Sequence, residues 1–241
     1  MSDTAYLFES SYISPFVFTQ TLIPLLQQTA REPASDVRIV NVGGIFANCG
    51  HMYLHERKVS SITHKLIPAS VNFNDFSDFN VTYRWRLLPG LYRYGMLLSS
   101  RHGRRLMLMI EGHSKFMITL WTKTLQRRLN EDSTAPITAL SIHPGGVDTY
   151  SHKWVFPRFF KFLVGLAIAH PVVGAYNSAF AAASKRIHDN KHVYQGVYLE
   201  SQPTGKIVPM NKAASDEELG NRLWALTVKF LEGIDLPCGT L

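Results

Sequence analysis

The sequence predicts an α/β protein of three layers, α/β/α, in which helices cover both faces of a doubly wound parallel sheet. Two short apolar runs, Val37–Val42 and Ile137–Ile142, are typical of buried strands, and turn-forming Gly and Pro residues follow each of them. Longer stretches with helical periodicity precede, separate and follow these runs. Helices that alternate with buried strands favour a parallel sheet covered on both sides.

Length and composition indicate a single globular domain over residues 1–241. Hydrophobic residues make up 46% of the chain and charged residues 18%, and no repeat or low-complexity linker divides it. The two cysteines, Cys49 and Cys238, make no disulfide framework, so we expect a reducing compartment, the cytoplasm. The longest uncharged apolar run, residues 162–169, is far below the roughly 20 residues of a membrane-spanning helix, so no transmembrane segment is predicted.

The net charge of the chain is +7, which raises the question of a nucleic-acid partner. A nucleic-acid-binding protein gathers its basic residues on one face, with aromatic side chains among them. Here the Lys and Arg residues are scattered along the chain. We therefore expect a small-molecule partner and no nucleic acid.

The first half of the chain predicts one helix, one strand and a long surface excursion. Residues 5–30 have helical periodicity, although Pro24 should kink the helix. A polar turn over residues 31–36 leads into the first strand. Residues 50–92 are irregular and suit a long excursion over the surface.

The second half predicts three helices and two strands. The first helix runs from Ser114 to about Asn130 and precedes the second strand. An Ala-rich helix covers Val172–Arg186, and a third, short strand covers Val197–Leu199. Ser215 and Glu218 form a capping box, in which each side chain satisfies a free backbone N–H, and this box opens the last amphipathic helix.

Six motifs stand in order along the chain: VRIVNVGG, GHSK, ITALSIHPGGVDT, GAYNSAFAAA, YQGVYLE and ELGNRLWAL. In this order they resemble the carboxyl-terminal two-thirds of the short-chain dehydrogenase/reductase family, most of all its retinol-dehydrogenase-like and fungal members. The resemblance covers nearly the whole chain apart from residues 96–112. It implies a partial Rossmann-like fold that lacks the family's first strands, which would leave a free sheet edge at Val37–Val42.

The resemblance implies an NAD(P)-dependent oxidoreductase acting on a carbonyl or alcohol of a small lipophilic molecule, as in secondary metabolism. NADP is slightly favoured over NAD as the cofactor. A Tyr of such enzymes acts as acid or base, and a Lys four residues later lowers the pKa of that Tyr from about 10 and holds the cofactor ribose. The family often forms a homodimer through its two long helices.

The resemblance assigns the catalytic and cofactor-binding Lys to Lys115. Glu111, and not a Tyr, stands four residues before it. We expect a Glu111–Lys115 pair to be a salt bridge that adds little to stability, and not an acid–base catalyst. The family's Ser, expected just after the first strand, falls on Gly44, and the supporting Asn of the early helix falls on Ser11.

The Pro-Gly motif after the second strand is intact. Pro144, Gly145, Val147 and Thr149 match positions that, by the resemblance, bind the nicotinamide end of the cofactor. His143 precedes this motif and is expected at the strand end, near the pocket.

Tyr94 is the candidate for the catalytic Tyr, but it stands 21 residues before Lys115. Removing the 17 residues Met96–Gly112 closes the chain into Tyr-Gly-His-Ser-Lys and restores the spacing of four. The removed length corresponds to 51 nucleotides and stays in frame, as a short intron would. We therefore suspect that 96–112 is a non-native insert, a translated intron; a genuine surface insertion is the alternative.

The amino-terminal phosphate-binding motif of the family is absent, since the chain holds no Gly-x-x-x-Gly-x-Gly. Together with the displaced Tyr94, this absence predicts impaired activity in this form. The alternative is a catalytically inactive family member, or a truncated fragment, with a binding or pairing role only.

Two further patterns are weaker. His51 and His55 have the spacing of a helical metal pair, but no third ligand stands out, so ordinary loop residues and no metal are expected. Four phenylalanines over residues 156–162 suit the protein core or a substrate lid, and a peripheral membrane contact through Trp154–Phe162 is a further alternative.

Overall fold

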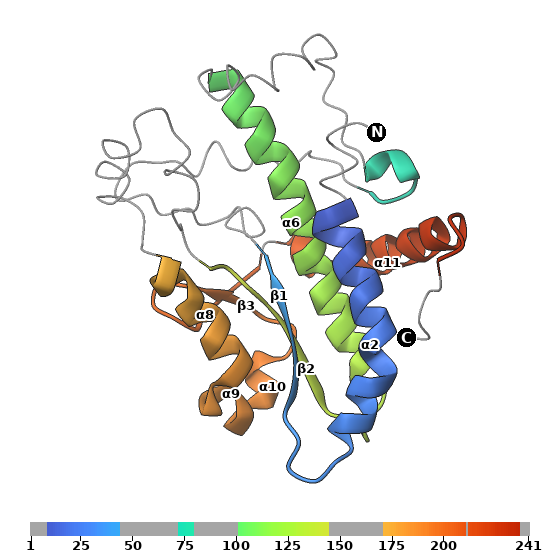
Figure 1. Ribbon diagram of the computed structural model, residues 1–241. Helices are drawn as coiled ribbons and strands as arrows, with labels where there is room; N and C mark the ends of the chain where they lie inside the picture. The colour runs from blue at the N-terminus through green and yellow to red at the C-terminus, as the bar shows by residue number, and fades with distance from the viewer. Residues whose placement is uncertain (1–8, 44–71, 80–100, 145–170, 211, 237–241) are drawn as a thin grey trace.

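A computed structural model describes residues 9–43, 72–79, 101–144, 171–210 and 212–236 (Figure 1). Its sheet has the strand order β1-β2-β3-β4. The strands are β1 (Val37–Val42), β2 (Ile137–Ile142), β3 (Tyr198–Glu200) and β4 (Lys206–Val208). The first three run parallel, and β4 is antiparallel to β3. The predicted fold class is therefore confirmed, as a mainly parallel sheet of the Rossmann-like type.

Helices form a layer on each side of the sheet (Figure 1). One layer holds α2 (Ser14–Ala30), α6 (Arg101–Leu129) and α11 (Glu217–Glu232). The other holds α8 (Pro171–Ala183), α9 (Lys185–Asp189) and α10 (Lys191–Tyr194). Three single turns complete the described elements: a π-turn η1 (Glu9–Ile13) and the 3-10 turns η3 (Phe76–Asp78) and η5 (Ala213–Ser215).

Alternation along the strands decides which side chains face which layer. Ile39 of β1 and Ala139 of β2 belong to the buried cluster with α2, α6 and α11. Leu140 and Ile142 of β2 belong instead to the cluster with α8, α9 and α10. Odd-numbered residues of β1 and β2 thus face α6, and even-numbered ones face α8.

Aromatic rings fill the space between the sheet and its α6 layer. Trp121 of α6 is 1% exposed and meets Phe16 at 5.5 Å and Tyr12 edge-on at 6.2 Å between ring centroids. The hydroxyl groups of Tyr12 and Thr227 lie 2.9 Å apart, which ties η1 to α11. Such ring pairs add directional packing to the burial of large apolar surfaces.

A glycine lets α11 cross closely over α6. A Cβ added at Gly220 would lie 2.2 Å from Oγ1 of Thr124, far inside van der Waals contact. Any larger side chain at position 220 would therefore push the two helices apart or displace Thr124.

Gln126 completes the backbone pairing of β2 where β3 does not reach. The pairing between β2 and β3 begins only at Ser141 and Tyr198. Earlier in β2, Nε2 of Gln126 donates to the carbonyl of Ile137 at 3.1 Å, and its Oε1 accepts from the amide of Ala139 at 2.5 Å. One side-chain amide thus replaces a strand partner and leaves these buried groups satisfied.

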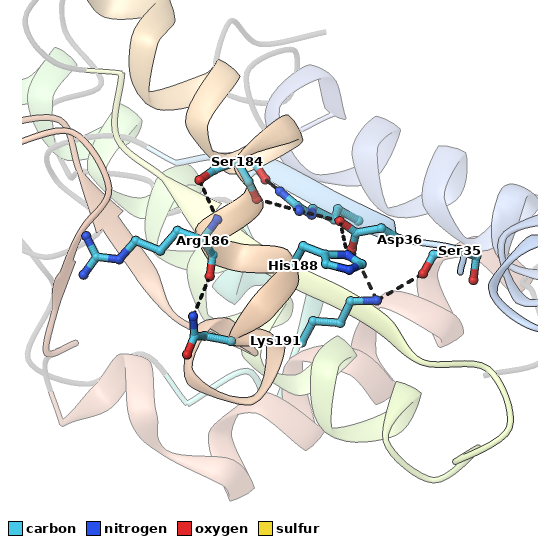
Figure 2. Close-up of polar contacts among 9 residues, drawn as sticks. Ser35, Asp36, Ser184, Arg186, His188 and Lys191 are labelled. Carbon is cyan, nitrogen blue, oxygen red and sulfur yellow. Dashed lines mark hydrogen bonds and ion pairs between the residues drawn. The ribbon is translucent and has the colours of Figure 1, made fainter. Parts of the chain in front are cut away.

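A cluster of charged groups joins the amino end of β1 to the α8 layer (Figure 2). Nδ1 of His188 lies 3.2 Å and Nζ of Lys191 lies 3.4 Å from the carboxylate of Asp36. Arg38 also pairs with Asp36, and its guanidinium donates to the carbonyl of Ser184 at 2.8 Å. Burial acts to raise the pKa of Asp36, but the hydrogen bond and charge of Arg38, with Lys191 and His188, hold that pKa below its ordinary value.

The start of α6 differs from the prediction. The helix begins at Arg101, thirteen residues before the predicted start at Ser114, so residues 101–112 continue into it without a break. Arg, Leu and Met are strong helix formers, and they are frequent over residues 101–110. The hypothesis that 96–112 is a non-native insert stays a prediction, since a helix-forming insert would join the helix in the same way.

The predicted helix Val172–Arg186 is wrong in its continuity, because it breaks into α8 and α9. Ser184 lies in an extended conformation between the two, and its hydroxyl accepts from the amide of Arg186 at 3.2 Å. Such a side chain starts a new helix, since it satisfies a free N–H of the first turn.

Three smaller differences concern the carboxyl-terminal third. Asp216, and not Ser215, caps α11, and its carboxylate accepts from the amide of Leu219 at 3.0 Å. The predicted third strand is shifted by one residue, and β4 was not predicted. A three-residue strand such as β4 offers too little alternation to be found in a sequence.

Two other predictions concern α2 and the edge of the sheet. The helix continues through Pro24 to Ala30 and is preceded by the π-turn η1, where one helix over residues 5–30 was expected. Within the described residues β1 pairs with β2 on one side and with no strand on the other.

Candidate active site

The carboxyl ends of β1 and β2 meet at one edge of the sheet, because the two strands are parallel and in register to their last residues, Val42 and Ile142. Open parallel sheets bind their ligands outside this edge. Residues that follow the two strands, and side chains of α6 that reach the same edge, are therefore the candidates for a site.

Lys115 reaches this edge from α6. Its ammonium group donates to the carbonyl of Val42, with 3.4 Å between Nζ and the oxygen. One turn later, the hydroxyl of Thr119 donates to the carbonyl of Lys115 at 3.0 Å, which orients Thr119 along the helix. The candidate catalytic Lys thus brings a cation to the end of β1, in a half-buried position.

Gly43 follows β1 at a point where the backbone packs tightly. A Cβ built there would lie 3.3 Å from the carbonyl of Ile142 and 3.5 Å from both Thr119 and Tyr198. These contacts explain the absence of a side chain at this position, because a Ser would press against its neighbours. Gly44, which matches the family's Ser, lies outside the described residues.

His143 follows β2 and is 7% exposed. Its backbone is held on both sides: the amide donates to the carbonyl of Leu199 at 2.8 Å, and the carbonyl accepts from Nδ2 of Asn177 at 2.8 Å. The imidazole is not held in this way, since its buried Nδ1 has no hydrogen-bond partner among the residues that the structure describes. Burial lowers the pKa of His143 to about 4, so the ring is neutral at pH 7.

Asn177 is a site-shaping residue that the sequence reasoning missed. Besides the carbonyl of His143, its Nδ2 donates to that of Leu199 at 3.1 Å, and its Oδ1 accepts from the amide of Gly205 at 2.9 Å. It is fully buried on α8. The available signal was a single amide in the apolar stretch GAYNSAFAAA, since a buried Asn must find partners for its carboxamide.

The remaining predicted residues fall into two groups. Pro144 follows His143 and is half-buried, and Ser11 lies in the π-turn η1, which packs on α6 through Tyr12 and Trp121. The others lie outside the residues whose side chains are described: Tyr94, Gly145, Val147, Thr149, Glu111, His51, His55, Cys49, Cys238 and the segment 154–162.

Neither a metal site nor a membrane span is present in the described part of the chain. There, no group of three or more His, Cys, Asp or Glu residues lies close enough together to hold a metal ion. No helix among the same residues is long and apolar enough to span a membrane.

A covered parallel sheet with a lysine and a buried histidine at its carboxyl edge defines an α/β protein of the ligand-binding, doubly wound class. No family model matches the chain. A short-chain dehydrogenase/reductase of Armillaria gallica is 31% identical over 93% of this chain and 60% of its own length. A short chain dehydrogenase/reductase of Colletotrichum higginsianum is 28% identical over 92% of this chain and 48% of its own length. An uncharacterized oxidoreductase of Schizosaccharomyces pombe is 26% identical over 94% of this chain and 55% of its own length.

These similarities extend over more than nine-tenths of the chain. The chain belongs to the short-chain dehydrogenase/reductase family. It spans about half to three-fifths of the length of the curated relatives that it matches.

Proposed function

We propose that this chain forms the nicotinamide-end and substrate part of an NAD(P)-dependent oxidoreductase. Its substrate would be a carbonyl or an alcohol of a small lipophilic molecule, with NADP favoured over NAD. The observation that carries this proposal is the contact of Lys115 with the end of β1, which brings a cation to the edge where parallel sheets bind ligands. The family relationship supports the reaction class.

The residues at this edge suit the nicotinamide end of a dinucleotide. Lys115 can donate to ribose hydroxyl groups, and the tightly packed Gly43 leaves the end of β1 without a side chain. Pro144, Gly145, Val147 and Thr149 would line the ring, by analogy with the family. The cofactor supplies or accepts the hydride, and the protein must hold the ring against the substrate carbon and move a proton.

The described residues provide no obvious acid or base for the proton-transfer step of this reaction. Because α6 is continuous, Glu111 stands one helical turn before Lys115, in the place where the family has its Tyr. Tyr94 would serve as the acid or base only if it returns to Lys115 through space. We therefore propose that the activity of this form is impaired.

Cofactor binding tests the proposal directly. NADPH is titrated into the purified chain, with tryptophan fluorescence and the unfolding temperature as readouts. We expect saturable binding that weakens at least about tenfold in Lys115→Gln, because an ammonium–hydroxyl hydrogen bond is lost. Lys123→Gln, two turns later on α6, is the matched control and should bind like the wild type. No response up to millimolar NADPH would overturn the proposal.

A pairing role without hydride chemistry is the second candidate. Phe18 and Leu25 stand seven residues apart on α2 and are 68% and 58% exposed, so an apolar stripe faces outward from a long helix. A homodimer would bury it. Sedimentation of the wild type and of Phe18→Asp separates the two cases: a dimer that the substitution dissociates supports pairing, and a monomer at all concentrations excludes it.

A further inference from the structure

His143 carries a buried polar atom that no described residue satisfies. Nδ1 has no hydrogen-bond partner in the described part of the chain, although the residue is only 7% exposed. A buried donor or acceptor without a partner destabilises the folded protein, because it has lost its hydrogen bond to water and gained none in return. Such an atom at the edge of a ligand-binding sheet therefore suggests that its partner belongs to the ligand.

The alternation of the strand indicates where this imidazole lies. Ala139 of β2 packs in the cluster with α6, whereas Ile142 packs on the α8 side. His143 continues the odd-numbered set, so it falls on the α6 side of the sheet. That is the side from which Lys115 reaches the end of β1, one strand away.

The position of His143 is fixed by its backbone. The carbonyl of Leu199 and the carboxamide of Asn177 hold its amide and carbonyl from two different elements, β3 and α8. The backbone that carries the ring is therefore fixed, which favours a specific hydrogen bond, and only side-chain atoms that cover Nδ1 must move when a ligand reaches it.

The chemistry of the ring selects the kind of partner. A buried neutral imidazole carries one N–H and one lone pair, and the tautomer decides which of them is on Nδ1. A primary carboxamide matches either tautomer, because it offers both an N–H donor and a carbonyl acceptor.

We propose that Nδ1 of His143 hydrogen-bonds the carboxamide of the nicotinamide ring and so positions that ring beside Lys115. The inference rests on the proposed function and names a recognition residue for it. His143 then acts on the orientation of the ring and takes no proton from the substrate.

Two substitutions separate recognition from packing. His143→Leu keeps an apolar side chain of similar reach without a polar atom, and His143→Asn keeps a polar atom near the position of Nδ1. The probes are nicotinamide mononucleotide and ribose 5-phosphate, which lacks only the nicotinamide ring, and binding to the full chain is measured by calorimetry. His143→Leu should raise the Kd for nicotinamide mononucleotide about five- to tenfold and leave that for ribose 5-phosphate unchanged. His143→Asn should stay within about threefold of the wild type.

The ligand-free protein gives the matching control. His143→Leu removes an unsatisfied buried atom, so its unfolding temperature should equal or exceed that of the wild type. A marked fall in unfolding temperature, with NADP binding unchanged, would show that the imidazole serves packing and would overturn the proposal.

A spectroscopic readout keeps the test valid if the variants fold poorly. In the wild type labelled with ¹⁵N-histidine, NADP and nicotinamide mononucleotide should shift the Nδ1 resonance of His143, and ribose 5-phosphate should not. An unshifted resonance in the NADP complex overturns this inference alone. If the wild type binds no NADP at all, the proposed function and this inference both fall.

Discussion

At the scale of single residues, two side chains at the carboxyl edge behave in opposite ways. The carboxamide of Asn177 makes three hydrogen bonds, to His143, Leu199 and Gly205, and so joins β2, β3 and the turn before β4. The imidazole of His143 leaves Nδ1 without a hydrogen-bond partner among the described residues. Polar groups whose hydrogen bonds are all made within the protein stabilise the fold. Polar groups at the carboxyl edge of the sheet that lack a partner are the ones available to bind a ligand.

The lowered pKa of His143 predicts how stability depends on pH. The unfolded chain binds a proton on this histidine near pH 6.5, but the folded protein does so only near pH 4. Between these values the unfolded state holds more protons, so the free energy of unfolding should fall as the pH is lowered from 6.5 to 4. The slope is at most about 1.4 kcal/mol per pH unit. Urea denaturation at several pH values measures it.

Two other groups must be separated from this effect. The raised pKa of Glu200, caused by burial, stabilises the fold as the pH falls toward its ordinary value of 4.5 and so opposes His143. The stability that Asp36 contributes, through its lowered pKa, is lost only as the pH falls below about 3.8 and through that lowered pKa. His143→Asn isolates the histidine, since the difference in slope between this variant and the wild type removes the other two. Equal slopes above pH 4 would contradict the prediction.

At the scale of helices and strands, close approach is set by small residues and by caps. The α6–α11 crossing depends on Gly220, and the break between α8 and α9 depends on Ser184. Ser184 shows why helix ends are hard to predict: Ser is tolerated inside a helix, and here its extended backbone and the bond that its carbonyl accepts from Arg38 of β1 belong to the tertiary structure.

Substitution at the helix crossing should be destabilising and specifically rescued. Gly220→Ala places a methyl group against Oγ1 of Thr124, so we expect a loss of about 1–3 kcal/mol in the free energy of unfolding. Thr124→Ala removes that oxygen, and the double variant should therefore be more stable than the sum of the two single effects. A double-mutant cycle by chemical denaturation measures the coupling. Strictly additive effects would show that the clash is relieved in another way.

At the scale of the whole molecule, the two ends of β1 contact different helical layers. Its amino end is clamped to the α8 layer by Asp36, Arg38, His188 and Lys191 (Figure 2). Its carboxyl end contacts Lys115 of α6. The strand at the edge of the described sheet is thus held by both helical layers while its last residue contributes to the candidate site.

Deletion of Met96–Gly112 tests the role of the whole segment. It brings Tyr94 to four residues before Lys115, on one face of α6, where a nearby ammonium lowers the pKa of a phenol. We expect the deleted form to reduce carbonyl substrates with NADPH at least tenfold faster than the full chain, measured by NADPH absorbance on a panel of lipophilic ketones.

The control for this experiment is the same deletion with Tyr94→Phe. It keeps the spacing and the fold and removes the phenol, so its rate should return to that of the full chain. A deleted form that folds and binds NADPH yet gains no activity would argue for a genuine surface insertion.

The three layers, the two buried strands, the amphipathic α11 and the family resemblance could all be predicted from local patterns, because apolar periodicity and the order of motifs are visible in the chain alone. The sequence also singled out Lys115 and His143. The folded protein was needed to show that Asn177 and Gln126 satisfy backbone groups of the strands, because these hydrogen bonds join residues well apart in sequence and no local pattern records them. The start of α6 at Arg101 and the cap of α11 by Asp216 are local features, but the sequence offered a competing residue for each: Ser114 for the helix start and Ser215 for the cap.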